Sequence, residues 1–241
     1  MTHWNEIRFP AREDRVWELY HENSKSPVFN HAREVAERLT ETLETLHVSL
    51  PVHGQWEKKL THRKSMSLLV KMDTNSGEDR MERQKTLSFE QLSAIMHFAA
   101  DRGKEKAGRK YAFLPLEVFG FAHRVEGMPS GLFHLDWKDM TIRVIHGAQD
   151  HMEFTGYLHD TVDARMWIFI TALFQRSALI FGEKGYRFAV SESGRMAQNI
   201  LLASNALGLS SQLEMQYCER KIETFIGIDG VDHALLQVVG L

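Results

Sequence analysis

The stretch that decides the fold runs from Phe181 to Gly208 and reads FGEKGYRFAVSESGRMAQNILLASNALG. Its large apolar side chains spread around the whole of a helix instead of forming one stripe; they are Val190, Met196, Ile200, Leu201, Leu202 and Leu207. A helix that is apolar on all sides is buried on all sides. Gly208 stands where a left-handed C-terminal residue is expected, so the helix should end at Leu207. The stretch therefore predicts a central helix from about Arg187 to Leu207 inside a globular domain.

The composition is that of a protein without nucleic-acid or membrane partners. The 241 residues are 43% hydrophobic and 25% charged, with a formal charge of −3. A slightly acidic chain lacks the clustered basic surface that phosphate binding needs. The longest apolar run, Met166 to Phe174, is about half of what a membrane span requires. The charged N-terminus does not resemble a signal peptide, and the single cysteine, Cys218, fits a reducing compartment. We expect a cytoplasmic protein.

The pattern along the chain predicts two parts. Residues 1–60 are charge-rich and carry one apolar helical stripe after Asn30, so we expect an N-terminal helical extension. Residues 61–241 form the main domain. Within it, Ser88 and Gln91 have the spacing of a capping box, which predicts a helix over about residues 88–102.

Several segments of the main domain alternate or are continuously apolar, as strands are. They are Leu116–Arg124, Gly131–Asp136, Thr141–His146, Arg165–Phe174 and Ala234–Gly240, with a short helix near Glu219–Phe225. The short link between the first two favours a hairpin. Antiparallel strands that are flanked by helices predict an α+β fold.

No phosphate-binding glycine loop, metalloprotease helix, Cys-x-x-Cys pair or hydrolase elbow occurs in the sequence. His146 and His151 are five residues apart across an expected turn, which is poor spacing for a metal site. We therefore expect no bound metal.

The residues Gly182-Glu183-Lys184-Gly185-Tyr186-Arg187, placed before such a helix, resemble the flavin-binding nitroreductase superfamily, and within it the SagB-type dehydrogenases. Leu114–Val118 (LPLEV) and Tyr20–Pro27 (YHENSKSP) resemble two further elements of that family. Ile180 and Phe181 stand where the family has Lys and Tyr. The resemblance implies a nitroreductase-like antiparallel sheet with flanking helices, a buried central helix and a dimer.

The same resemblance implies that the cofactor is FMN and suggests residues for it. Arg63 and Ser65 resemble the R-x-S-x-R element that holds the flavin phosphate, and a guanidinium with hydroxyl donors suits a phosphate dianion. Ser67 stands where the second Arg is expected, so Arg80 would have to supply that charge. Tyr111 replaces a glycine of a loop that packs on the flavin.

Met215 and Gln216 fall where the family turns a backbone N–H towards flavin N5. A donor at that place stabilises the charge that reduction puts on N5. These two residues therefore complete the flavin-binding set that the resemblance implies.

The resemblance implies an FMN-dependent dehydrogenase or oxidase that converts azolines to azoles in a ribosomally made peptide. In the family the Lys-Tyr pair is implicated in proton removal. Ile180 and Phe181 cannot transfer a proton. The nearest residues that can exchange or stabilise charge are Glu183, Tyr186 and Arg187.

Two other hypotheses remain open on the sequence. The chain could be a catalytically degenerate subunit that completes a heteromeric complex with an active paralogue, because the Lys-Tyr pair, the glycine loop and one phosphate Arg are all replaced. It could also be a structural α+β protein without flavin. The partner would be a second copy of the chain or a paralogous oxidoreductase subunit.

Overall fold

The computed structural model describes residues 54–61, 86–100, 115–137, 140–147 and 164–241. The elements, in chain order, are β1 (Glu57–Lys59), β2 (Leu87–Ser88), α4 (Phe89–Ala100), β3 (Leu116–Ala122), β4 (Val125–Glu126), β5 (Gly131–Asp136), β6 (Thr141–Gly147), β7 (Met166–Leu173), α6 (Phe174–Phe181), η5 (Gly182–Lys184), α7 (Gly185–Ala206), β8 (Gln212–Glu214), α8 (Glu219–Ile226) and β9 (His233–Gly240).

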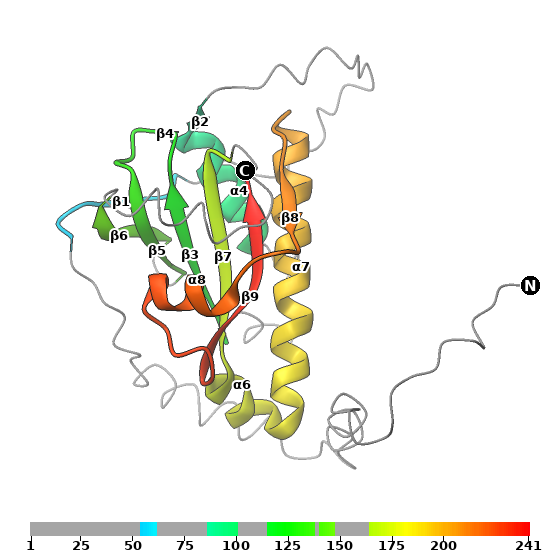
Figure 1. Ribbon diagram of the computed structural model, residues 1–241. Helices are drawn as coiled ribbons and strands as arrows, with labels where there is room; N and C mark the ends of the chain where they lie inside the picture. Colours follow the sequence, from blue (N-terminus) through cyan, green and yellow to red (C-terminus); the bar gives the residue numbers. More distant parts are fainter. Residues whose placement is uncertain (1–53, 62–85, 101–114, 138–139, 148–163) are drawn as a thin grey trace, which may run out of the picture.

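The strands form a seven-stranded sheet in the order β1-β6-β5-β3-β7-β9-β8, and neighbouring strands in it are antiparallel (Figure 1). A second, two-stranded pairing joins β2 and β4 in parallel. Central strand β3 pairs with β5 and β7, with Val118 opposite both Leu135 and Ile170. The predicted α+β architecture with a large antiparallel sheet is confirmed.

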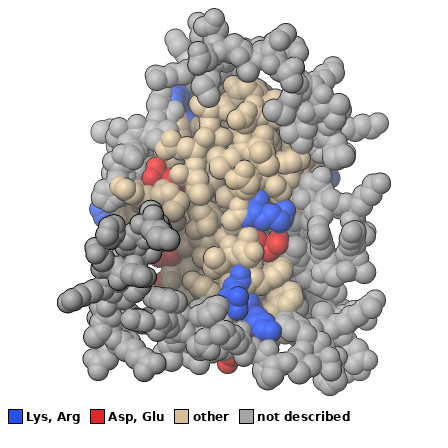
Figure 2. Space-filling model, turned by 90° about the vertical axis from the view of Figure 1, so that its right-hand side faces the viewer, with Lys and Arg blue, Asp and Glu red and all other residues tan. Residues whose placement is uncertain are grey.

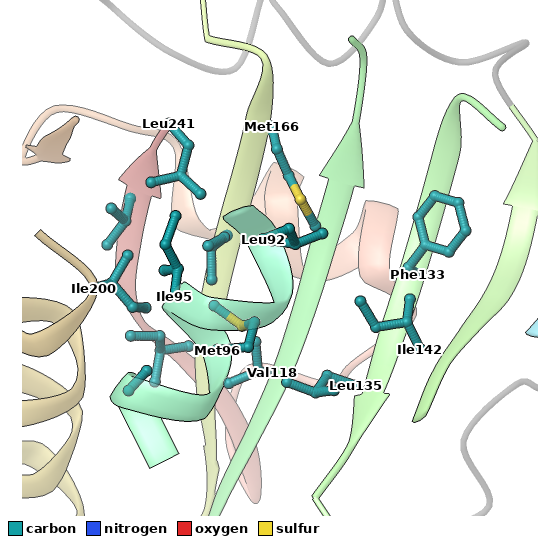
Figure 3. Packing of buried hydrophobic residues seen from close by; sticks show 14 of the residues in the cluster. Leu92, Ile95, Met96, Val118, Phe133, Leu135, Ile142, Met166, Ile200 and Leu241 are labelled. Carbon is teal, nitrogen blue, oxygen red and sulfur yellow. The ribbon is translucent and has the colours of Figure 1, made fainter. Parts of the chain in front are cut away.

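The sheet is covered on both faces, which explains why β3 and β7 contain only buried residues. Alternate side chains of β3 enter two separate clusters: Val118 packs in one, Phe119 in the other. The first cluster contains the buried faces of α4 and α7, and the second contains the buried face of α8. Figure 3 shows Leu92 and Ile95 of α4 packed against the sheet within the first cluster.

The start of α4 has the predicted capping box. The Ser88 backbone N–H donates to Gln91 Oε1 at 3.0 Å, and the Gln91 backbone N–H donates to Ser88 Oγ at 3.1 Å. Each side chain thereby satisfies a backbone donor that the first helical turn leaves open. The helix is mostly buried, and its predicted continuation to residue 102 lies outside the described residues.

The predicted central helix exists as α7, but it is buried along one face only. Ala189, Met196 and Ile200 are fully buried, whereas Val190 is 38% and Leu202 48% exposed. The prediction of burial on all sides is wrong for the single chain, because the sheet and helices α4 and α6 cover one side of α7. Figure 2 views the molecule from the exposed side of α7 and shows a broad area without charged residues, beside which lie a few Lys or Arg side chains and an acidic side chain.

The helix stop and most element bounds agree with the sequence. Gly208 has a positive φ of 72° and its N–H donates to the Asn205 carbonyl oxygen, as a C-terminal glycine does. The predicted hairpin is formed by β3 and β5, and α8 begins at Glu219 as expected. Helix α6 was not predicted; the expected strand ends at Leu173, and the chain turns directly into this helix.

The division of the chain at residues 60 and 61 stays a prediction, since residues 1–53 lie outside the described part. Glu57–Lys59 form an edge strand of the sheet, with Glu57 opposite Arg143 of β6. Within the described ranges, no helix is long and apolar enough to cross a membrane.

Candidate functional site

The resemblance places the candidate site at the elbow where α6, η5 and α7 follow one another. Gly182 ends α6 with φ 58°, a conformation that glycine adopts without strain. Gly185 lets α7 start directly on α6, since a Cβ atom there would lie 2.5 Å from the carbonyl carbon of Ser177. The two glycines of the GEKG sequence therefore have structural roles: one turns the chain and the other permits close packing of two helices.

Two pairs of aromatic rings pack together at the elbow. The Phe181 ring lies 4.4 Å from the Phe188 ring, centroid to centroid, and the Phe174 ring lies 4.9 Å from the Tyr186 ring. Such ring pairs stabilise a fold beyond the area they bury. At the position where the resemblance expects a tyrosine, Phe181 thus contributes packing and has no group for proton transfer.

The three candidate catalytic residues lie on the outer side of the elbow. Glu183 belongs to η5, and Tyr186 and Arg187 belong to the first turn of α7. All three side chains are exposed, Tyr186 at 43%. The structure therefore brings them to one surface, where a carboxylate and a phenol could exchange protons with a molecule bound there.

The second candidate position is the turn after β8. The backbone N–H groups of Met215 and Gln216 both donate to Oε1 of Glu214, each at 2.9 Å. Glu214 is only 4% exposed, whereas the Met215 side chain is 76% exposed. The predicted donors are present, but in this structure their acceptor is a carboxylate of the same chain.

The predicted phosphate-binding residues Arg63, Ser65, Ser67 and Arg80 lie outside the described residues, as does Tyr111. The side chain of Ile180 is likewise not described. Among the residues that the structure describes, no group of three or more His, Cys, Asp or Glu side chains could hold a metal ion.

Sequence reasoning missed a buried polar cluster at the end of the sheet beside α6. The Glu117 carboxylate accepts from His134 Nε2 at 2.9 Å and pairs with Arg176 of α6. Beside it, Thr171 Oγ1 lies 2.7 Å from His233 Nε2 and donates to the Glu117 carbonyl oxygen at 3.2 Å. The sequence offered one signal for this cluster: Glu117 and His134 are polar residues within the otherwise apolar strands LEVFGFA and GLFHLD.

Two pKa values in this cluster are displaced. Burial alone would raise the pKa of Glu117, but the hydrogen bond with His134 and the charge of Arg176 outweigh it and hold that pKa below its usual range. Burial lowers the pKa of His233 to about 4, so this imidazole is neutral near pH 7. Because these groups are buried among their partners, the cluster's evident role is to join α6 and β9 to the centre of the sheet.

The fold is that of nitroreductase-like α+β proteins. The nitroreductase family model matches residues 135–241, less than half of the chain. A relative named as a candidate nitroreductase, MJ1384 of Methanocaldococcus jannaschii, is 25% identical over 160 residues, which are 63% of this chain and 80% of the relative. The chain is thus similar to nitroreductases in sequence, above all in its C-terminal part.

Solved structures show the same similarity in fold. One, from Anabaena variabilis ATCC 29413 and assigned as a nitroreductase, has a TM-score of 0.55 at 20% identity. The match covers 64% of this chain but only 34% of that one, so the chain spans about a third of its length. A similarly assigned structure from Ralstonia eutropha JMP134 has a TM-score of 0.53 at 20% identity and covers 79% and 95% of the two chains.

A third similar structure is the Escherichia coli microcin synthetase McbBCD complex with truncated pro-MccB17 bound. It matches with a TM-score of 0.55 at 16% identity and covers 93% of this chain and 90% of the other. At such low identities these three similarities establish the fold, and the SagB-type assignment stays a hypothesis.

The nitroreductase family generally binds flavin, usually as FMN. The described residues that would contact a flavin do not fit it in their present arrangement. The two backbone donors at Met215 and Gln216 are bound to the buried Glu214 carboxylate. A carboxylate at that point also opposes the negative charge that reduction places on a flavin.

Proposed function

We propose that the chain is a nitroreductase-fold subunit of a multi-subunit, FMN-dependent oxidoreductase that acts on a ribosomally made peptide. In this proposal a paralogous subunit supplies the catalytic pair. The observation that carries it is the elbow, where Phe181 packs on Phe188 in the place of a residue able to transfer protons. An oxidation that removes a ring proton needs a base beside the reacting carbon.

Two further observations support a partner. The similar microcin synthetase structure is a complex of several subunits with a peptide precursor bound, and the match spans nearly the whole of this chain. The outer face of α7 exposes Val190 and Leu202, and a Cβ atom added at Gly194 would meet nothing within 4 Å. A helix face that exposes uncharged side chains, among them apolar ones and a glycine, permits close approach of another helix. Helix α4 offers less surface, since most of it is buried within the chain.

The proposal predicts that the isolated chain oxidises azoline peptides little or not at all, even with added FMN. Loss of a positioned acid or base lowers a rate by about a hundredfold to ten-thousandfold. The test is to purify the chain alone and together with the products of its neighbouring genes, and to record visible flavin spectra and azoline oxidation for each preparation. Turnover should appear only in the co-purified complex, and robust turnover by the chain alone would contradict the proposal.

A pair of variants tests whether the exposed face of α7 binds the partner subunit. Leu202→Asp places a charge on the exposed face of α7 and should abolish co-purification. Val231→Asp alters an even more exposed apolar residue outside α7 and should leave co-purification intact. If both variants co-purify with the partner as the unchanged chain does, the α7 face is not the interface.

A second candidate function is a self-sufficient FMN-dependent dehydrogenase or oxidase. It is favoured by the exposure of Glu183, Tyr186 and Arg187 together at the elbow, where they could reach a substrate. In that case the chain alone would turn over, and Glu183→Gln, Tyr186→Phe and Arg187→Gln, assayed one at a time, would show which residue moves or stabilises the proton. Under either candidate function, we propose that Arg63 and Ser65, with Ser67 or Arg80, bind the FMN phosphate. We also propose a cytoplasmic location under either function.

A further inference from the structure

Glu214 occupies an unusual place for a carboxylate. It is the last residue of β8, opposite Val238 of β9, and it is 4% exposed. Its Oε1 accepts from the N–H groups of the next two residues, and Gln212 Nε2 lies 3.5 Å from its Oε2. The side chain therefore folds back onto the turn that it precedes.

Two successive backbone N–H groups that converge on one point form a favourable site for a negative or polar acceptor. Hydrogen bonds from such donors to an ionised carboxylate are stronger than those to a neutral acceptor. Because Glu214 is part of the same chain, it competes for these donors without the entropy loss that a free ligand has on binding. Any other acceptor must first displace it.

The surroundings of the turn are acidic as well. Tyr217 is flanked by Glu219, Glu223 and Glu214, and burial followed by these three charges raises the pKa of its phenol to about 12. An electron-rich or anionic ligand approaching this corner therefore meets negative potential in addition to occupied donors.

We infer that Glu214 closes the Met215–Gln216 turn against a flavin, so that the isolated chain binds FMN weakly until this carboxylate is displaced or neutralised. The inference rests on the proposed function in one respect: a flavin is taken to bind at this turn. It adds a residue that regulates that binding. The exposed side chains of Met215 and Gln216 do not close the turn; the buried carboxylate does.

The test is FMN binding by the full chain, followed through quenching of FMN fluorescence at pH 7.5. Glu214→Ala frees both N–H groups and removes the charge, and should tighten FMN binding by about tenfold or more. Glu214→Gln removes the charge but keeps an acceptor, and should give an intermediate affinity. Glu219→Gln changes the net charge equally at an exposed residue nearby but leaves both N–H groups bound to Glu214, and should therefore tighten FMN binding much less than Glu214→Gln does.

Thermal unfolding of each variant shows which variants are folded. If Glu214→Ala does not fold, the difference in FMN affinity between Glu214→Gln and Glu219→Gln tests the inference. Equal FMN affinity of the unchanged chain and the folded Glu214 variants overturns the inference while leaving the proposed flavin function standing. If the folded Glu214 variants bind no FMN at millimolar concentration, the inference and the proposed cofactor of this chain both fail.

Discussion

Two glycines of one helix illustrate how strongly the environment of a residue decides its role. Gly185 is buried, and a Cβ atom placed there would lie within 2.5–2.7 Å of the backbone of Ser177 and Ala178. Gly194 is exposed, nine residues further along α7, and a Cβ atom there would meet nothing within 4 Å. In a helix interior, a glycine costs free energy relative to alanine unless close packing requires it.

We predict opposite effects of alanine at these two positions. Gly185→Ala forces a methyl group against a backbone that cannot move aside, and should lower the free energy of unfolding by about 1–3 kcal/mol. Gly194→Ala should raise it by about 0.5–1 kcal/mol through helix propensity alone. Urea denaturation of both variants gives the two values, and a stable Gly185→Ala protein would show that α6 and α7 do not pack as described.

Helix α6 depends on its ion pair with the sheet. Its Arg176 pairs with Glu117 of β3, whose other carboxylate oxygen accepts from His134 of β5. The side chains of Arg176 and Glu117 are 18% and 10% exposed. Removing one member of a buried pair leaves an uncompensated charge, whereas removing both can be almost neutral. The pair therefore ties the first turn of α6 to β3.

For this element we expect Arg176→Met to lower the free energy of unfolding by about 3 kcal/mol or more. The double variant Arg176→Met/Glu117→Gln should recover part of that loss, because it no longer buries an unpaired charge. As a comparison, Arg195→Met breaks the more exposed pair with Glu192 and should cost about 1 kcal/mol or less. Chemical denaturation of the parent, the single variants Arg176→Met and Glu117→Gln, and the double variant completes the cycle; additive losses in the double variant would argue against the pair.

At the scale of the whole molecule, the buried polar cluster ties stability to pH. His233 is 5% exposed, and burial lowers its pKa from the ordinary 6.5 to about 4. Below pH 6.5 the unfolded chain gains a proton on this imidazole that the folded chain does not accept until about pH 4. The charges that face it are those of Glu117, Arg176, Asp229 and His134. His233 therefore costs stability only on the acidic side of its ordinary pKa.

We predict that the free energy of unfolding falls by about 3 kcal/mol between pH 6.5 and 4 because of His233 alone. The lowered pKa of Glu117 adds a loss that sets in as the pH falls through that pKa, below its usual range. Urea denaturation at intervals from pH 7.5 to 4.5 measures the slope. His233→Gln should flatten it over this range, and an unchanged slope would show that the imidazole is protonated in the folded protein.

The sequence by itself determined the parts of the fold that local chemistry controls. The capping box at Ser88 and Gln91 and the left-handed Gly208 are decided by interactions within one turn of a helix, so they can be read from neighbouring residues. Strands β3, β5, β6, β7 and β9 of the large sheet were predicted because a buried strand shows an alternating or continuously apolar segment, and the nitroreductase-like motifs agreed with the resulting α+β fold. The short edge strands β1 and β8 carry no such pattern and were not predicted.

The tertiary structure alone decided what each side chain of the site contacts. The one-sided burial of α7 depends on which elements cover it, and the identity of its apolar residues does not reveal this. Helix α6 was missed because the first turn of α6 is held by a contact with Glu117, far away in the sequence, and no local pattern reveals that contact. The closure of the Met215–Gln216 turn depends on the conformation of Glu214, which no spacing pattern encodes. Contacts between residues distant in sequence, and the rotamers they select, come only from the folded chain, because packing rather than local propensity chooses them.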